Sequence, residues 1–242
     1  MVGRATGEGF SRFGNSVVFY DTDKEKILEL HREGFEVSEK PVSQADIHFI
    51  CTPEGAVEKV LDPLAMVDGL IVIRSSVLPG STVRLMKKYG RHISHNPEFL
   101  KAATASWDFL NPDRIVIGEC CENHGDILEK LYKPLRAPIV RVDPTTSEMI
   151  KLASNATLSA YISFWNEIHK ICEKIGVNSH LVGKVSSMDK RISEYGASMH
   201  GRAFGGACLP KDLDHLIEFS EENGYTPELL KAIKNLNERM KT

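Results

Sequence analysis

The chain has 242 residues, of which 42% are hydrophobic and 26% are charged, and its formal net charge is −3. This balance is ordinary for a folded protein and argues against a broad nucleic-acid-binding surface, which needs a basic surplus. No apolar run approaches the ~20 residues that cross a bilayer, and the N-terminal MVGRATGEGF lacks the apolar core of a signal peptide. We therefore expect a cytoplasmic protein that binds neither membrane nor nucleic acid.

The five cysteines are irregularly spaced, which suits neither a disulfide framework nor a zinc motif. Adjacent Cys120 and Cys121, followed by His124, raise the alternative of a metal site. Zinc motifs usually have paired, separated ligands, so a polar loop is the favoured interpretation of this segment and no metal is expected.

The first part of the chain alternates between apolar runs and helical patterns. A helix over residues 4–14 precedes the apolar run 16–21, and a second helical pattern with Ile27, Leu28 and Leu30 stops at Gly34. Further strands are expected within 45–52, 69–76, 91–99 and 112–118. Such alternation indicates βα units, and the predicted fold is α/β, Rossmann-like, with a mostly parallel sheet.

The N-terminus carries part of a dinucleotide-binding pattern. Gly3 opens a helix, and the strand that follows this helix ends at Asp21, where such folds place a carboxylate for a ribose hydroxyl. The strand that normally precedes the glycine turn is not in this sequence. An acid at a strand end is more often a simple turn residue, and this signal alone leaves both interpretations open.

The pattern changes after residue 143. Residues 145–175 contain neither Gly nor Pro and repeat apolar residues at helical spacing, which predicts one long helix. The remainder looks helical, with one Gly-rich interruption at 200–212. We therefore predict a Rossmann-like domain over 1–143 and a helical domain over 144–242.

The Gly-rich interruption holds the most unusual chemistry. Gly205 and Gly206 permit a tight turn, and Cys208 follows just before Pro210, a residue that favours the first turn of a helix. A cysteine at a helix N-terminus beside Lys211 has its thiolate stabilised. The alternative is a small buried hydrophobic residue, which the neighbouring glycines and charges make less favoured.

Three other residues are candidates for polar chemistry. Lys151 and Asn155 lie four apart on the long helix, so they share a face where a cation and an amide can stabilise an oxyanion. Glu98 stands beside a proline after a strand, a fixed position that suits a general base. Taken by themselves, Lys151 and Asn155 are more typical of a solvated polar stripe, and Glu98 alone decides little.

Taken together, these segments resemble the UDP-glucose/GDP-mannose dehydrogenase family over nearly the whole chain, in the same order. The matching stretches are SSVLPGST (75–82), NPEFLKAATASWDFLNPDRIVIG (96–118), SEMIKLASN (147–155), FWNEIHKICEKIG (164–176) and FGGACLPKD (204–212).

The resemblance implies an NAD-dependent, four-electron oxidation of a nucleotide sugar to the uronic acid through a cysteine thioester. By its match, Cys208 is the nucleophile, and Lys151 and Asn155 steady the developing alkoxide. Asp212 matches the carboxylate that orders water or accepts a proton. Glu98 matches the base for thioester hydrolysis, and Ser76 stands where the family usually has a water-positioning Thr.

The same resemblance implies the ligand contacts and a homodimer built on the 147–175 helix. The glycine turn and the matched NAD contacts comprise Gly3, Asp21, Lys26, Thr52 and Lys211. The matched substrate contacts are Phe99, Leu100, Phe204, Gly205 and Gly206.

Three departures from the family pattern matter. Without the first strand, we expect the sheet to be split and NAD binding to be poor if these 242 residues are the whole product. Family members continue into a further α/β domain for the nucleotide sugar, and Ala102 replaces the acid that follows the PEFL motif. An alternative hypothesis is therefore a catalytically incompetent remnant that acts as a dimerisation or binding module.

Overall fold

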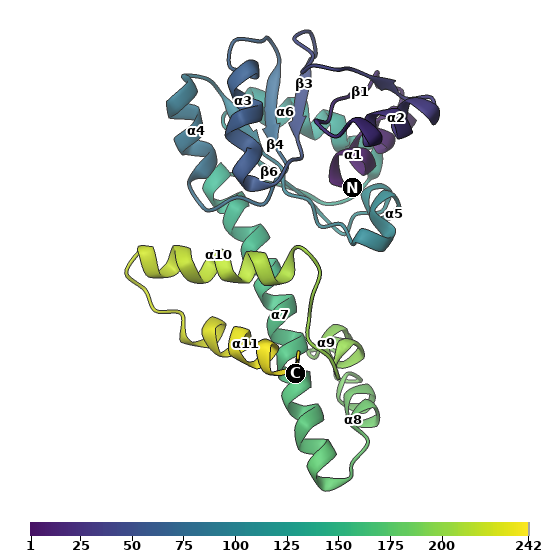
Figure 1. Ribbon diagram of the computed structural model, residues 1–242, viewed down its shortest axis with the longest axis vertical. Helices are drawn as coiled ribbons and strands as arrows, with labels where there is room; N and C mark the ends of the chain where they lie inside the picture. The colour runs from purple at the N-terminus through teal and green to yellow at the C-terminus, as the bar shows by residue number, and fades with distance from the viewer. Residues whose placement is uncertain (242) are drawn as a thin grey trace. The chain divides into compact units, whose positions relative to one another are not determined.

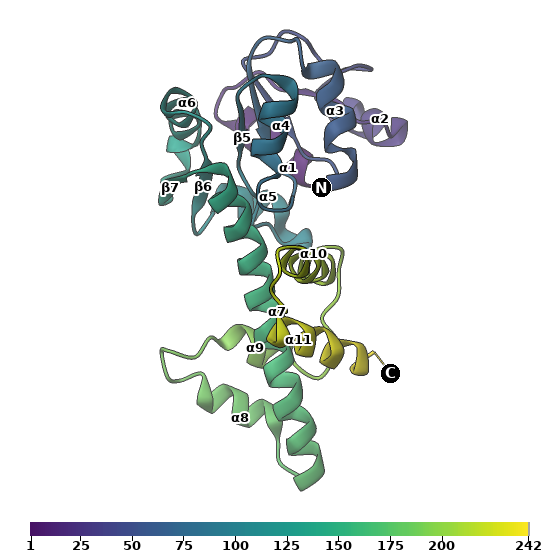
Figure 2. The same ribbon diagram turned by 90° about the vertical axis from the view of Figure 1, so that its left-hand side faces the viewer.

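A computed structural model describes residues 1–241 of the chain. The chain forms two compact units, Met1–Lys151 and Leu152–Thr242, shown from two sides in Figures 1 and 2. The boundary falls inside helix α7 (Pro144–Ile175), whose first turns belong to the first unit.

The strands of the first unit form two separate sheets. Strand β1 (Val18–Phe19) pairs in parallel only with β2 (Glu36–Val37). A five-stranded sheet has the order β3-β4-β5-β6-β7, parallel except where β5 and β6 meet. The expected α/β fold is confirmed, and so is the split of its sheet. The strands of the larger sheet are β3 (Ile47–Ile50), β4 (Leu70–Ile73), β5 (Ile93–His95), β6 (Ile115–Gly118) and β7 (Ile139–Val142).

Strand β4 shows why this sheet is buried on both faces. Leu70 and Val72 pack in one apolar cluster with Phe10, while Ile71 and Ile73 pack in a second cluster. Since side chains of a strand alternate between faces, a continuous apolar strand requires cover on both sides. Five helices of this unit contribute residues to these two clusters: α1 (Val2–Arg12), α3 (Val57–Leu64), α4 (Ser81–Tyr89), α5 (Ala105–Leu110) and α6 (Glu122–Tyr132). Helix α2 (Lys24–Arg32) contacts β2 of the smaller sheet.

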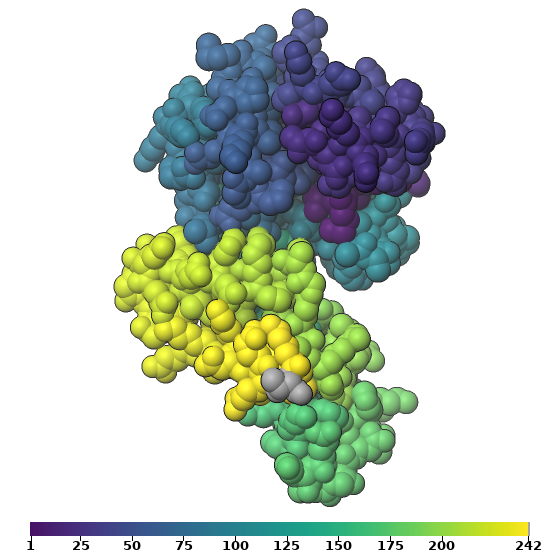
Figure 3. Space-filling view, in the orientation of Figure 1, coloured from purple at the N-terminus to yellow at the C-terminus, as the bar shows by residue number. Residues whose placement is uncertain are grey.

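The second unit consists of helices joined by loops, with no strand among its described residues. Its core contains Trp165 of α7, Leu213 and Ile233, all at most 5% exposed. Helices α10 and α11 contact each other, and their side chains form a continuous surface in Figure 3. No helix within residues 1–241 combines the length and apolar character needed to span a membrane. The helices that accompany α7 are α8 (Ser179–Ser186), α9 (Glu194–Met199), α10 (Leu209–Glu222) and α11 (Glu228–Arg239).

Two predicted elements differ in length from the observed ones. The long helix was expected over 145–175 and is observed over Pro144–Ile175, because Pro144 is tolerated in the first helical turn. The strand expected over 16–21 is only Val18–Phe19, since its one partner, β2, is equally short.

Candidate functional site

Three of the predicted site residues follow three neighbouring strands. Thr52, Ser76 and Glu98 come after β3, β4 and β5, which pair in parallel. The carboxyl ends of parallel strands meet at one edge of the sheet, which is where ligands bind in open α/β folds. The first unit therefore places these three side chains along the expected edge.

The residues predicted to contact NAD offer suitable groups in the first unit. The Thr52 hydroxyl is buried and has no hydrogen-bond partner among residues 1–241, so it can bond to a ligand. Asp21 follows β1 and is partly exposed, with the Lys26 ammonium 3.8 Å from its carboxylate. Gly3 lies near the start of α1, where an added Cβ would stand 3.4 Å from Cys51 Cβ, beside Thr52 at the end of β3. An exposed carboxylate, an unpartnered hydroxyl and a helix N-terminus fit a dinucleotide.

Glu98 and Lys151 form a buried ion pair. The Lys151 ammonium lies 3.0 Å from Glu98 Oε1 and also donates to the Glu98 carbonyl oxygen at 2.6 Å. The second carboxylate oxygen accepts the Leu100 amide at 2.6 Å. Their side chains are only 7% and 5% exposed, so each charge depends on the other for compensation. The sequence predicted separate roles for these residues but not their contact.

Phe99 and Leu100 line a cavity of about 310 Å³ in the first unit. The Arg114 guanidinium stacks on the Phe99 ring with its carbon 4.0 Å from the ring centroid. The Lys151 ammonium also faces this ring, 5.4 Å from the centroid. The cavity is lined by aromatic and apolar groups together with three cations and three acids, a mixture that suits a polar ligand.

In the second unit, Cys208 is exposed and is the N-cap residue of α10, as the sequence predicted from Pro210. One turn into the helix, Asp212 is fully buried and accepts the Asn155 amide at 2.5 Å. The Lys211 ammonium lies 2.7 Å from the other Asp212 oxygen. Lys211, predicted to contact NAD, thus contacts Asp212 within its own unit.

The loop before Cys208 is held by asparagine side chains that the sequence interpretation missed. Asn237 of α11 bonds to both the amide and the carbonyl of Phe204, at 2.7 and 3.0 Å. Asn166 of α7 accepts the Gly201 amide and donates to the Arg202 carbonyl, at 2.8 and 2.9 Å. The available signal was an amide at a position of each helix where periodicity requires an apolar residue.

Gly205 and Gly206 lie in this loop, directly before Cys208. Gly206 has a φ of +79°, a conformation that side chains of L-residues disfavour. An added Cβ at either glycine meets no atom within 4 Å. The glycines therefore serve backbone shape and open access rather than tight packing.

Three buried polar side chains of the first unit, those of Glu148, His95 and Ser147, also went unpredicted. Glu148, on α7, accepts the Gly80 and Thr82 amides at 2.6 and 2.7 Å and so caps helix α4. Burial raises the pKa of Glu148, although these bonds oppose the shift. His95 bonds to the Ser147 hydroxyl at 2.8 Å, and burial lowers the pKa of His95 to about 4.

The predicted catalytic residues thus form two groups, one in each unit. Glu98 and Lys151 are paired in the first unit. Ser76 lies at a neighbouring strand end of the same unit. Asn155 and Asp212 are hydrogen-bonded in the second unit, where Cys208 begins the same helix as Asp212.

Two regions of the chain match domains of one family. Residues 35–136 match the NAD binding domain of the UDP-glucose/GDP-mannose dehydrogenase family, and residues 145–239 match its central domain. The chain belongs to this family. NAD is the cofactor that the first domain implies, in agreement with the groups that Asp21 and Thr52 offer.

Curated relatives and solved structures of the UDP-glucose/GDP-mannose dehydrogenase family extend the match to almost the whole chain. A UDP-glucose 6-dehydrogenase of Bacillus subtilis is 34% identical over 98% of this chain and 63% of its own length. A UDP-glucose 6-dehydrogenase of Rickettsia conorii is 37% identical over 83% of this chain and 46% of its own length. The structure of a UDP-glucose dehydrogenase from Pyrobaculum islandicum superposes with a TM-score of 0.90 at 28% identity, covering 98% of this chain and 65% of that one. The chain therefore spans less than two thirds of the length of these relatives.

Proposed function

We propose that this chain carries the NAD-binding and catalytic cysteine parts of a nucleotide-sugar 6-dehydrogenase that oxidises a sugar of the UDP-glucose type to its uronic acid. The observation that carries the proposal is Cys208, exposed at the N-cap of α10 with the connected Asn155 and Asp212 nearby in the same helical unit. A thiol at a helix N-terminus is a suitable nucleophile because the helix dipole favours its thiolate.

The chemistry begins at the primary alcohol of the sugar. NAD, when bound, accepts the hydride of each of the two oxidation steps. The Lys151 ammonium and the Asn155 amide stabilise the negative oxygen that develops as the alcohol becomes an aldehyde. The Asp212 carboxylate, which accepts from Asn155, takes up the proton or orders the water that carries it away.

Cys208 then captures the aldehyde. Its sulfur adds to the carbonyl carbon and the oxygen gains a proton, which gives a thiohemiacetal with a hydrogen that can leave as hydride. Loss of that hydride and of the hydroxyl proton gives a thioester on Cys208. Covalent capture retains the aldehyde between the two oxidations.

Hydrolysis of the thioester completes the reaction. Glu98 accepts a proton from the attacking water, and the half-buried Ser76, at the adjacent strand end, helps to position that water. Water adds to the thioester carbon, the carbon–sulfur bond breaks, and Cys208 regains its proton. The products are the uronic acid and the original thiol.

The test is NADH formation by the purified chain with NAD and a panel of UDP- and GDP-sugars. We expect two NADH per sugar consumed and one preferred donor. Cys208→Ser should lower turnover by at least ~1000-fold, because a serine hydroxyl lacks the nucleophilicity of a thiolate. The matched control is Cys172→Ser, a buried cysteine of α7 that plays no part in the proposed chemistry.

Two results would contradict the proposal. Full activity of the Cys208→Ser variant would exclude the thioester route. If no donor gives NADH while a direct titration shows that NAD still binds, the chain has the fold of the family but not the proposed activity.

A second candidate function, a dimerisation or binding module without catalysis, is favoured by the division of the sheet into two parts. Direct titration with NAD separates the two candidates. Failure to bind NAD at millimolar concentration favours the module, whereas saturable binding favours the enzyme. A cytoplasmic location accompanies the enzyme, because Cys208 must stay reduced to act as a nucleophile.

We also propose a homodimer that forms through α7. Tyr161, Phe164, Ile171 and Ile175 repeat at intervals of three, seven and four residues and are 41–67% exposed, so they form an apolar stripe on one face. Sedimentation should give a dimer at micromolar concentration, and Phe164→Glu should give a folded monomer. A wild-type monomer at that concentration would exclude this assembly.

A further inference from the structure

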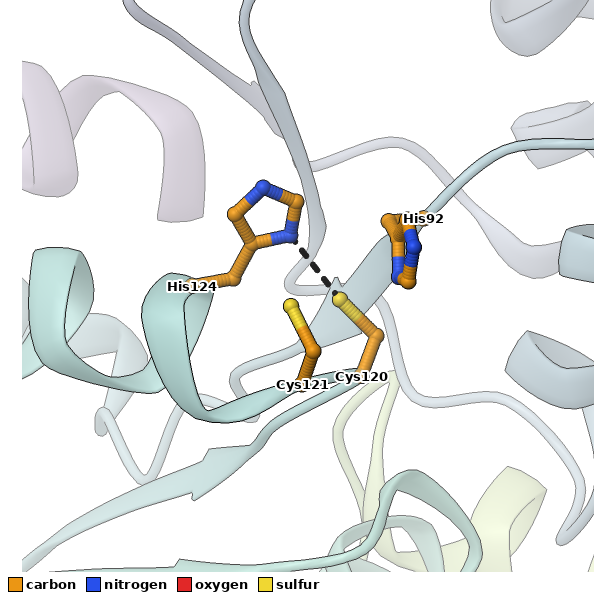
Figure 4. A group of neighbouring side chains, drawn as sticks. All are labelled: His92, Cys120, Cys121 and His124. Atoms are coloured by element: carbon orange, nitrogen blue, oxygen red, sulfur yellow. Dashed lines mark hydrogen bonds between the residues drawn. The ribbon is translucent and has the colours of Figure 1, made fainter.

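Four potential metal ligands meet at one end of the large sheet, away from every residue assigned above. They are His92, Cys120, Cys121 and His124, and one ligand atom from each lies within 4.8 Å of all the others. Figure 4 shows both thiols directed into the space between the two imidazole rings. The polar loop expected for the two cysteines is thus only part of the structure, since His124 lies in helix α6.

The fold brings these residues together from three elements. His95 of β5 pairs with Gly118 of β6 in antiparallel register. His92 precedes His95 by three residues and Cys121 follows Gly118 by three, so the two chain segments meet beyond the pairing. Cys121 is the N-cap of α6, and His124 stands in the first turn of that helix.

The geometry is close to that of a tetrahedral site. Zinc bond lengths place neighbouring ligand atoms ~3.3–3.8 Å apart in a tetrahedron. Cys120 Sγ and His124 Nδ1 are 3.0 Å apart, and the widest separation in the cluster is 4.8 Å. Shifts of the ligand atoms by about 1 Å, through small changes of side-chain torsion, therefore suffice to bring all four atoms to one ion.

The surroundings select against hard cations. Two acids close in sequence to the cluster, Glu119 and Asp126, are held by Arg141 with contacts of 2.6 and 2.5 Å. The donors left are two sulfurs and two imidazole nitrogens, the set typical of zinc rather than magnesium or calcium. The Ser94 hydroxyl lies 3.4 Å from Cys120 Sγ, where it can orient the sulfur as an outer partner.

We propose that His92, Cys120, Cys121 and His124 form a structural zinc site. Four protein ligands close the coordination shell, so the ion fastens the start of α6 to the segment before β5 and has no open position for a substrate. The site lies within the first unit and is independent of the proposed dehydrogenase activity.

The test is zinc content and cobalt spectroscopy of the full-length reduced chain. We expect one zinc per chain after dialysis against trace metal, and a Co²⁺ spectrum with thiolate charge-transfer and intense tetrahedral bands. His92→Gln is the first variant to make, because His92 is exposed and its replacement should therefore leave the fold intact. It should weaken zinc binding at least ~100-fold, more than the loss of an outer partner. Cys121→Ser should do the same.

Matched controls separate this site from other thiols and histidines. His31→Gln, at an exposed histidine of α2, should keep full zinc binding. Cys208→Ser should also retain the metal, whatever it does to turnover. Retention of zinc by both His92→Gln and Cys121→Ser would overturn the proposal. So would an octahedral Co²⁺ spectrum, or a disulfide between Cys120 and Cys121 in chain purified under reducing conditions.

Discussion

The two units bury polar groups in different ways. The first unit buries full charges and ionisable side chains: the Glu98–Lys151 pair, the carboxylate of Glu148 and the imidazole of His95. The second unit also buries one carboxylate, that of Asp212, but it holds the loop before Cys208 with amides, because Asn166 and Asn237 bond to the backbone of that loop. Buried charges require an oppositely charged partner, whereas a buried loop requires side-chain amides that bond to its backbone.

The difference follows from the presence or absence of a sheet. In the first unit, the strands fix where the chain turns, so buried side chains can be reserved for chemistry at the strand ends. In the second unit no strand is described, and the loop from Gly201 to Cys208 has little secondary structure to bond with. Buried backbone groups need partners, so helix side chains must supply them. The loop geometry therefore depends on a few asparagines.

The largest expected effect comes from breaking the charge pair of the first unit. Glu98→Gln leaves the Lys151 ammonium buried without a counter-charge and should destabilise that unit by about 3–5 kcal/mol. The measurement is hydrogen exchange of the β4 amides, which reports the first unit alone. The double variant Glu98→Gln, Lys151→Met should recover most of the loss. If the double variant is as unstable as Glu98→Gln, then lost packing and not an uncompensated charge causes the destabilisation.

A pH dependence comes next in size. Burial lowers the pKa of His95 to about 4, with smaller contributions from the charges of Arg74 and Lys151. An unfolded chain binds this proton near pH ~6.5, so the folded state loses stability as the pH falls from ~6.5 toward 4. The stabilisation is fully present above ~6.5, and its loss reaches about 3 kcal/mol at the acid end.

The comparison that isolates this imidazole is wild type against His95→Gln, in urea unfolding between pH 7 and pH 4.5. The slope of stability with pH should be smaller in the variant across this window. Identical slopes would show that other groups carry the dependence. Glu148 has the opposite sign: because burial raises its folded-state pKa, its ionisation weakens the folded state as the pH rises.

In the second unit, Asn237→Ala should cost about 2 kcal/mol, since it leaves the Phe204 amide and carbonyl without partners in a buried loop. Exchange of amides in α10 and α11 measures this loss. The exposed Asn235 of the same helix offers a matched control, Asn235→Ala, which should be nearly silent. If both substitutions have the same effect, helix propensity explains it and the amides do not hold the loop.

The smallest effect should come from the surface. Arg4 of α1 contacts Glu8, Glu29 and Glu33 at 2.5–2.8 Å, and the last two lie on or beside α2. Because Arg4 is 38% exposed and solvent screens these pairs, Arg4→Ala should cost at most about 1 kcal/mol. Thermal unfolding at low and high salt checks this, with Arg12→Ala as control. A larger loss at Arg4 would show that the packing of α2 beside α1 depends on these ion pairs.

Much of the fold could be predicted because its signals are local. The gap-free periodicity of 145–175 predicts α7 almost to the residue, and the continuous apolar run at 69–76 predicts β4. The position of Cys208 at a helix start could be predicted from Pro210 alone. These inferences use neighbours in the sequence, where steric and hydrogen-bonding rules act directly.

Contacts between distant residues could not be predicted in the same way. Glu98 and Lys151 are separated by 53 positions, and each was a candidate without the other. His92 entered no sequence argument, because only the antiparallel register of β5 and β6 brings it to Cys121. The adjacent cysteines looked unsuited to zinc because the sequence does not show that the segment before β5 brings His92 to them.

The division of the sheet has a consequence for how the chain behaves in concentrated solution. Strand β3 ends the five-stranded order, and no strand within residues 1–241 bonds to its outer side. Its residues Ile47–Ile50 carry mostly apolar side chains and include neither proline nor a charged blocking residue such as lysine. An extended segment from any source can add to such an edge through main-chain hydrogen bonds. Aggregation of this chain should therefore begin at β3, and His48→Lys, at the one residue of this strand that belongs to neither apolar cluster, should delay it.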